Sequence, residues 1–314
     1  MDLELTDEQT MLGEALTTLL EREWLPAETA HTATPAQRAR LWSALQEFFD
    51  EDLGAVELCL AARLLGAHLA STPFVGSAAL RYVGVPHTER VAIALPATPV
   101  EHAAEVDRFA VVGEGTIALV AAADATIEPA ASLDIGTPLF TVTADGGELH
   151  EVDVARLTAI GALLAAAESV GAAERMLSDA CSYAAERRQF GRTIGSYQAL
   201  RHILADMYVS QASAWSTVLY AAAALDDNLS DAARTAAVAK AYVARAAREV
   251  GHGAIQVFGG VAFTEEHQAH RFLRRIVVRE QQFGDAAHHE RELGRALAAT
   301  TRRHDDSPVP TPVS

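Results

Sequence analysis

Long helical patterns dominate the C-terminal half of this sequence, and their length limits the folds that the chain can adopt. Apolar residues recur at helical spacing in four segments: 153–185, 196–227, 230–258 and 265–301. The last segment is expected to break near Phe283 and Gly284. Helices of this length bury an apolar face only along other long helices, and frequent alanines allow close contacts between them. The pattern therefore predicts an antiparallel helical bundle.

Shorter elements precede the bundle. Helical patterns with Thr6 and Thr34 as caps predict a small helical domain over residues 1–88. Short β-branched or alternating runs follow: RVAIAL, RFAVVG, TIALVAA, PLFTVTA and ELHEVDV. They predict a reduced antiparallel β domain over 89–152, before a bundle at 153–303 and a Pro-rich, disordered tail at 304–314. The expected class is α+β, with an N-terminal helical domain, a small β middle domain and a C-terminal four-helix bundle, an order that assigns no function by itself.

Charge and hydropathy argue against two classes of partner. The formal net charge is −17, so the surface repels nucleic-acid phosphates. The acidic start MDLELTDEQTML lacks the order of a signal peptide, and the most apolar stretch, 157–167, is too short to span a bilayer before Glu168. Cys59 and Cys181 show no metal spacing. We expect a cytoplasmic protein that binds neither nucleic acid nor membrane.

The stretch ERRQFGRTIGSYQALRHILADMY, residues 186–208, places positive charge, an aromatic ring and glycines just before a helix. Its cationic and amide side chains are those of Arg187, Arg188, Gln189 and Arg192. Free backbone N–H groups near Ser196 and the helix dipole favour an anion, and Phe190 offers a flat face. These features suit a pyrophosphate with an attached ring system. The alternative is a solvated basic turn with Phe190 as a core plug.

A second polar stretch, GAIQVFGGVAFTEEHQAHRFLRR at 253–275, follows the third bundle helix. Gly259 and Gly260 come after a strongly helical run, where paired glycines end a helix or let a ligand or another backbone approach closely. Gln256 lies about one helical turn earlier on the same side. The alternative is an ordinary glycine cap.

Together the two stretches resemble the acyl-CoA dehydrogenase family. The first matches that family's Arg–x–Gln–Phe–Gly turn, the glutamine that follows it (Gln198) and the helix sequence LADM at 204–207. The second matches a glutamine-led run of the family through Gln256, Val257, Phe258, Gly259, Gly260, Phe263, Thr264, Glu266, Arg271 and Arg274. The two matches occur in the family's order and cover the C-terminal half. The N-terminal helices and the middle sheet fit the family's three-part layout.

The resemblance implies FAD as the cofactor. Arg187 and Phe190 would contact its pyrophosphate and neighbouring groups, and Gln256, Gly259 and Gly260 would lie along its adenosine side. The implied cofactor-binding set is Arg187, Gln189, Phe190, Gln198, Gln256, Val257, Gly259 and Gly260. In this family such contacts reach across a subunit interface into the neighbour's flavin, so the resemblance implies a clamp on a flavin held by two chains.

The family's catalytic base is missing from its usual positions. Dehydrogenation of an acyl-CoA needs a carboxylate close to the α-carbon, but the turn QQFGDAAHH places Phe283 or Gly284 where the glutamate is expected. Some members carry the base on the first bundle helix, where this chain has Gly161. Asp285 is expected to cap the final helix and Glu280 to be a solvated helix residue. The catalytic residue is therefore unknown.

The middle segment also departs from the family, because VAIALPATPVEHAAEV lacks the family's contacts to the flavin ring and substrate. A missing base, a trimmed sheet and an intact clamp resemble the shortened subunits of bacterial heteromeric acyl-CoA dehydrogenases that act in sterol breakdown. The resemblance implies an FAD-dependent oxidoreductase subunit in an α2β2 complex with a homologous catalytic partner chain. Its substrate would be a bulky acyl-CoA, such as a steroid-derived one.

Other functions stay open. An independent homo-oligomeric dehydrogenase could use Asp285 as an unconventional base, and a non-catalytic scaffold subunit could keep the same fold. His267 and His270 lie one helical turn apart, but no second matched pair accompanies them, so we expect no metal site and expect both to hydrogen-bond within the helix layer.

Overall fold

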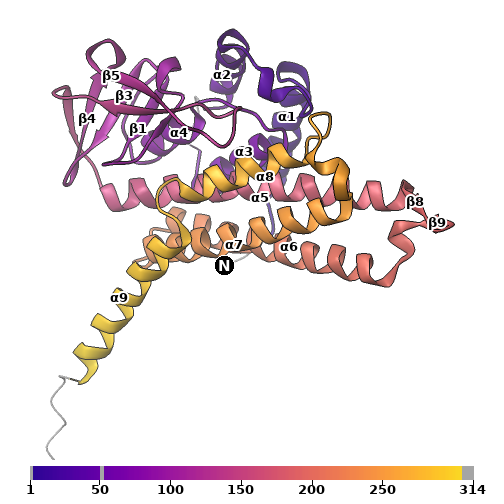
Figure 1. Ribbon diagram of the computed structural model, residues 1–314. Coiled ribbons are helices and arrows are strands. Elements are labelled where there is room, and N and C mark those ends of the chain that lie inside the picture. Colours follow the sequence, from indigo (N-terminus) through magenta and orange to yellow (C-terminus); the bar gives the residue numbers. More distant parts are fainter. Residues whose placement is uncertain (1–2, 50–52, 306–314) are drawn as a thin grey trace, which may run out of the picture.

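The computed structural model describes residues 3–49 and 53–305, which form an α+β fold as predicted (Figure 1). The N-terminal helices are α1 (Asp7–Glu23), α2 (Pro35–Phe49), α3 (Ala55–Ala67) and α4 (Phe74–Tyr82). The caps lie where the sequence predicts them: Thr6 forms a capping box with Gln9, and α2 begins at Pro35. The sequence analysis missed α4, because residues 74–80 are all buried and show no polar face.

The middle segment forms two sheets. Its strands are β1 (Val91–Ala94), β2 (Val100–Glu101), β3 (Arg108–Val112), β4 (Thr116–Ala121), β5 (Thr126–Ala130), β6 (Leu139–Thr143) and β7 (Glu148–Glu151). One sheet has the order β1-β3-β4-β7 and the other β2-β6-β5. The expectation of purely antiparallel pairing is wrong at one place, since β1 and β3 are parallel. Between them β2 leaves for the second sheet, and this crossover brings β3 back in the direction of β1.

The long helices form the predicted bundle. They are α5 (Val154–Glu186), α6 (Gln198–Asp226), α7 (Ala232–Phe258), α8 (Ala269–Gln281) and α9 (Ala286–Asp305). The predicted break separates α8 from α9, and both Phe283 and Gly284 have positive φ there. Helix α9 projects from one end of the bundle (Figure 1). The remainder of the predicted tail, 306–314, lies outside the described residues.

Helix α5 is the central element of the bundle and has the length that the sequence predicts. It has 33 residues and is long and apolar enough to cross a membrane, but 78% of its apolar window is buried inside the chain. The expectation that its apolar stretch is too short to span a bilayer is therefore wrong by length and composition alone. Glu168 is only 2% exposed, because arginines from α8 neutralise it.

Helices α3 and α5 cross at very short range through two glycines. A Cβ at Gly171 would lie 1.7 Å from the Arg63 carbonyl oxygen, and a Cβ at Gly66 would lie 1.9 Å from the Glu168 carbonyl oxygen. Each glycine therefore makes room for the backbone of the opposite helix. This reciprocal contact fixes the N-terminal helices against the bundle.

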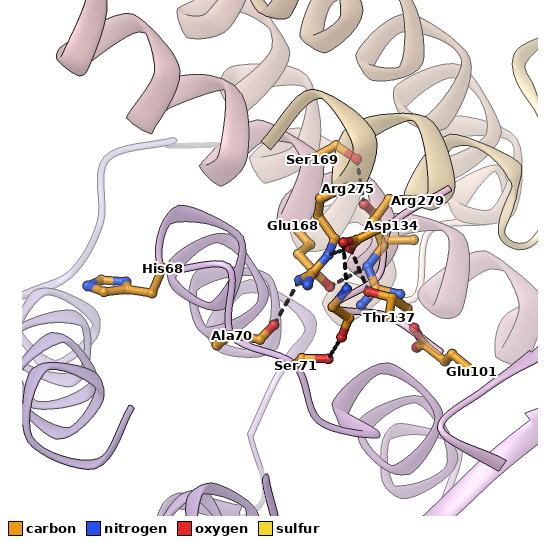
Figure 2. A network of polar contacts seen from close by, with 12 residues as sticks. His68, Ala70, Ser71, Glu101, Asp134, Thr137, Glu168, Ser169, Arg275 and Arg279 are labelled. Carbon is orange, nitrogen blue, oxygen red and sulfur yellow. Dashed lines mark hydrogen bonds and ion pairs between the residues drawn. The ribbon is translucent and has the colours of Figure 1, made fainter. Parts of the chain in front are cut away.

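A buried ionic network joins the N-terminal helices, the sheets and the bundle (Figure 2). Arg275 contacts Asp134 of the β5–β6 loop at 2.5 Å and Glu168 of α5 at 2.9 Å. It also donates to the Ala70 carbonyl that follows α3, at 2.8 Å. One turn later on α8, Arg279 pairs with Glu101 and, at 2.7 Å, with Glu168. Arg275 and Arg279 are the largest fully buried side chains of the described residues, and each is 1% exposed.

The network keeps the carboxyl groups of Glu101 and Asp134 ionised. Burial alone would raise the pKa values of Glu101 and Asp134, but the neighbouring guanidinium groups of Arg279 and Arg275 keep both below their ordinary values. Breaking such a pair on one side leaves a buried charge without its partner. The network therefore stabilises the docking of the sheets on the bundle only while both signs are present.

His102, beside the network, makes folding stability depend on pH. Burial lowers its pKa from 6.5 to about 4. Between these two pH values His102 is protonated in the unfolded chain and neutral in the folded chain. Its contribution to the free energy of unfolding is therefore complete above about pH 6.5 and is lost as the pH falls to about 4. The loss should reach roughly 3 kcal/mol. Urea titrations at pH 7.5 and 4.5 should show it, with a smaller loss in His102→Asn, since asparagine also tolerates the left-handed φ of 55° found there. An equal loss in both proteins would contradict this assignment.

Candidate functional site

The first predicted stretch folds as a short hairpin at one end of the bundle (Figure 1). Strands β8 (Arg188–Gln189) and β9 (Arg192–Thr193) flank Phe190 and Gly191, whose φ values are 52° and 83°. A phenylalanine in the left-handed region is uncommon and marks a position worth explaining. Its ring is 92% exposed, so the alternative of a core plug is wrong.

Contacts behind the hairpin hold it in position. The Arg192 guanidinium lies 3.8 Å from the centroid of the Tyr197 ring, and the Tyr197 hydroxyl donates to the Gln189 carbonyl at 3.3 Å. Gly195 lets the chain pass close to α5, because a Cβ there would lie 2.8 Å from the Ala184 carbonyl oxygen. The hairpin is thus fixed on its bundle side, while its outer face is open.

The second predicted stretch ends α7 beside the hairpin. Gly259 has φ 67° and caps the helix, its N–H donating to Ile255. Gly260 is different: its φ is not in the left-handed region, and a Cβ there would meet nothing within 4 Å. Contacts within the described chain therefore explain Gly259 but leave Gly260 free for close approach from outside.

The two stretches meet across a hollow of about 540 Å³. The predicted residues that line it are Arg187, Gln189, Phe190, Gln256 and Val257. Its apolar floor comes from Tyr183, Ile194, Leu200, Ile203 and Phe258, among others. The other predicted residues lie outside the lining: Gln198 is exposed in the first turn of α6, and Gly259 and Gly260 follow the end of α7. Segments about 70 residues apart in sequence thus form one site.

The chemistry of this hollow fits the anionic and aromatic parts of FAD. The side chains of Arg187 and Gln256 are exposed, and within the described residues neither has a hydrogen bond or an ion pair. An unpaired guanidinium attracts a phosphate. Because the net charge of the chain is −17, an anionic ligand needs a locally basic site of this kind. The exposed ring of Phe190 offers a surface for a flat group.

The two positions expected for a catalytic base face each other, and neither holds an ionisable group. The ring of Phe283 packs on Gly161, where a Cβ would lie 2.4 Å from Phe283 Cε1. Asp285 caps α9 as predicted, with Oδ1 accepting from the His288 N–H at 2.7 Å. The arrangement offers a ligand clamp without a proton acceptor at either family position.

Other titratable groups near these elements have structural roles. Glu280, expected on a solvated face, is only 9% exposed and pairs with Arg248, so that expectation is wrong. His267 and His270 contact nearby backbone groups through their Nδ1 atoms, as expected. In the part of the chain that the structure describes, no group of three or more His, Cys, Asp or Glu residues could hold a metal.

Comparisons with known proteins match the C-terminal half to a family model and the whole fold to solved structures. Residues 154–298 match the acyl-CoA dehydrogenase, C-terminal domain. Acyl-CoA dehydrogenase IpdE2 of Mycolicibacterium smegmatis is 29% identical, over 92% of this chain and 98% of its own. The ChsE4-ChsE5 complex from Mycobacterium tuberculosis contains a chain with the same fold, at TM-score 0.76 and 22% identity over 98% of this chain and all of that one. The Tcur3481-Tcur3483 steroid ACAD gives TM-score 0.71 and 21% identity, covering 93% and 99%.

Proposed function

Because residues 154–298 match the acyl-CoA dehydrogenase C-terminal domain, we propose that this chain is a member of that family and supplies one half of a flavin site to a catalytic partner chain in an FAD-dependent acyl-CoA dehydrogenase. Acyl-CoA dehydrogenases are FAD-dependent flavoproteins. The observation that carries the proposal is a contrast within one chain. Five residues, called the clamp here, converge on an open hollow at the end of the bundle: Arg187, Gln189, Phe190, Gln256 and Val257. In contrast, Gly161 and Phe283 occupy both positions of the family's catalytic base.

The surface around the clamp is exposed and apolar, which suits contact with another subunit. Phe190, Phe263 and Val261 are exposed apolar residues at this end of the bundle, 92%, 75% and 38% exposed. Together with the open backbone at Gly260 they form a surface suited to contact with another subunit. We propose that a homologous partner covers it, in an α2β2 arrangement. The ChsE4-ChsE5 complex is a pairing of two different chains among the structural neighbours.

The roles of this chain's residues follow from the clamp. Arg187 would hold the pyrophosphate, Gln189 and Gln256 would donate to polar groups of the dinucleotide, and Phe190 would pack on a flat part of it. Bound FAD would supply the hydride acceptor that α,β-dehydrogenation of an acyl-CoA needs. The proton at the α-carbon needs a carboxylate, which the partner would supply. We propose a cytoplasmic complex whose substrate is a bulky acyl-CoA; the neighbour described as a steroid ACAD supports a steroid-derived one.

Two other functions have less support. A homo-oligomeric enzyme with Asp285 as base would need that side chain to leave its hydrogen bond at the start of α9. A scaffold without redox chemistry would leave the unpaired charge of Arg187 without a purpose.

Flavin content of the complex tests the proposal. We expect Arg187→Ala, co-expressed with the partner, to weaken FAD binding tenfold to a hundredfold, about 1.4–2.7 kcal/mol. Arg188→Ala is the matched control, since it removes the same charge from the same hairpin while Arg188 lies outside the hollow and donates to the Gly191 carbonyl. Equal effects of the two variants would contradict the clamp. A lone chain that binds stoichiometric FAD and oxidises acyl-CoAs would contradict the need for a partner.

A further inference from the structure

Phe283 stands between two hollows of very different size. The larger, about 840 Å³, is lined by α5, α7 and α9, and the smaller, about 30 Å³, by β1, β2 and the start of α4. Three residues line both of them: Leu95, Thr98 and Phe283. The smaller hollow has room for little more than a water molecule. The two spaces are therefore adjacent, with the side chain of Phe283 at their boundary.

The ring of Phe283 and the missing side chain of Gly161 fit each other. A Cβ at Gly161 would lie 2.4, 2.6 and 2.8 Å from three atoms of the ring, which is closer than any real contact. Glycine inside a helix costs about 1 kcal/mol relative to alanine. At Gly161, inside α5, this cost is explained by the space that the ring needs.

The backbone of the loop is fixed around this ring. Phe283 has φ 55°, which is unfavourable for an aromatic residue. Its carbonyl oxygen lies 3.0 Å from His289 Nε2, which must carry the proton because a carbonyl only accepts. Lys240, 1% exposed, donates to the Arg279 carbonyl at 2.6 Å at the end of α8, and Arg279 donates to Gln282 Oε1 at 2.7 Å. The conformation is held from both sides of the loop.

The sheet side of the boundary is closed by charge. Glu101, at the end of β2, pairs with Arg279 and lines the smaller hollow together with Gln282. This pair belongs to the buried network that joins the sheets to the bundle (Figure 2). We call the two hollows together the crevice between sheet and bundle. The ion pair of Glu101 with Arg279 closes it on the sheet side, and the ring of Phe283 closes it between the two hollows.

We propose that Phe283 is a plug, which keeps flat apolar groups out of this chain's own crevice and whose removal joins the two hollows into one ligand-accepting channel. A plugged crevice confines ligand binding to the clamp end and the partner. The proposal rests on Phe283, Gly161 and their surroundings and not on the flavin clamp, so either can fail without the other.

Binding of 2-naphthol, a flat and mostly apolar probe, tests the plug in the full-length chain without FAD. We expect Phe283→Ala to gain one saturable site with a dissociation constant at least tenfold below that of any wild-type site. Phe140→Ala is the control, a half-buried phenylalanine of β6 that lines neither hollow. Equal affinity in wild type and Phe283→Ala, or the same gain in Phe140→Ala, would overturn the proposal.

Stability measurements on Gly161 give a second readout, with Phe283→Leu replacing Phe283→Ala if the latter does not fold. Gly161→Ala should lower the melting temperature of the wild type by at least 5 °C and leave that of the Phe283 variant within 1–2 °C, because the clash is removed with the ring. Gly161→Leu in the Phe283→Ala background should also abolish the new naphthol site. Additive changes in melting temperature would show that the two side chains are not matched, and would overturn the plug.

Discussion

Gly171→Val should leave no folded chain at 25 °C. The two branches of valine would start from a Cβ that lies 1.7 Å from the Arg63 carbonyl oxygen, and this oxygen belongs to the backbone of α3 and cannot rotate away. The helices would have to separate, which would also lose the opposite contact of Gly66 with Glu168. Overpacking among side chains typically costs 1–3 kcal/mol. A clash of a side chain with the backbone of the opposite helix should exceed about 5 kcal/mol, which is the stability of many whole domains.

Gly13→Ala is the matched control for this prediction. Gly13 also lies inside a helix, α1, but a Cβ there would meet nothing within 4 Å. Alanine should therefore stabilise the chain by about 1 kcal/mol through helix propensity alone. Soluble yield and the urea midpoint measure both variants. A soluble Gly171→Val protein with a cooperative transition near that of wild type would show that the α3–α5 crossing is looser than described.

The sequence predicts the bundle well because helical periodicity accumulates over about 30 residues, whereas short strands carry a weaker signal. The break between α8 and α9 could be placed at Phe283 and Gly284 since both glycine and the loss of periodicity mark it. The parallel pairing of β1 with β3 could not be read in the same way. It depends on β2 joining a different sheet, which is a tertiary choice and not a local pattern.

Part of the site was accessible from sequence for a different reason. Helices α5, α6 and α7 run antiparallel in succession, so the α5–α6 connection and the end of α7 lie at the same end of the bundle, and Arg187 and Gln256 meet there. The buried ionic network was missed, because charged residues inside helices are most often solvated. One signal was available: Arg275 and Arg279 stand four residues apart within a helix that has Phe272 and Ile276 on the same face, and Glu168 interrupts the most apolar helix.

Removing the charge of Arg275 should cause the next largest loss, about 3–5 kcal/mol for Arg275→Leu. Leucine fills part of the space, but among the described residues it leaves Asp134, 4% exposed, with Thr137 and the Gly136 N–H as the remaining partners of its side chain. It also removes the donor to the Ala70 carbonyl. Denaturant unfolding measures the loss. Arg234→Leu is the control, because Arg234 and its partner Asp231 are 55% and 46% exposed at 3.0 Å and should contribute less than 1 kcal/mol.

The double variant Arg275→Leu/Asp134→Leu separates the two causes of this loss. We expect the penalty to come mainly from the buried carboxylate of Asp134 once it has lost its counterion. In that case the double variant, which lacks this carboxylate, should unfold at a higher denaturant concentration than Arg275→Leu alone. Glu168 would keep Arg279 as its counterion in both proteins. Losses that simply add would mean that Asp134 and Arg275 stabilise the chain independently, and the network would then be a set of separate contacts. Partial recovery would instead show that charge balance across the three groups of elements holds the sheets on the bundle.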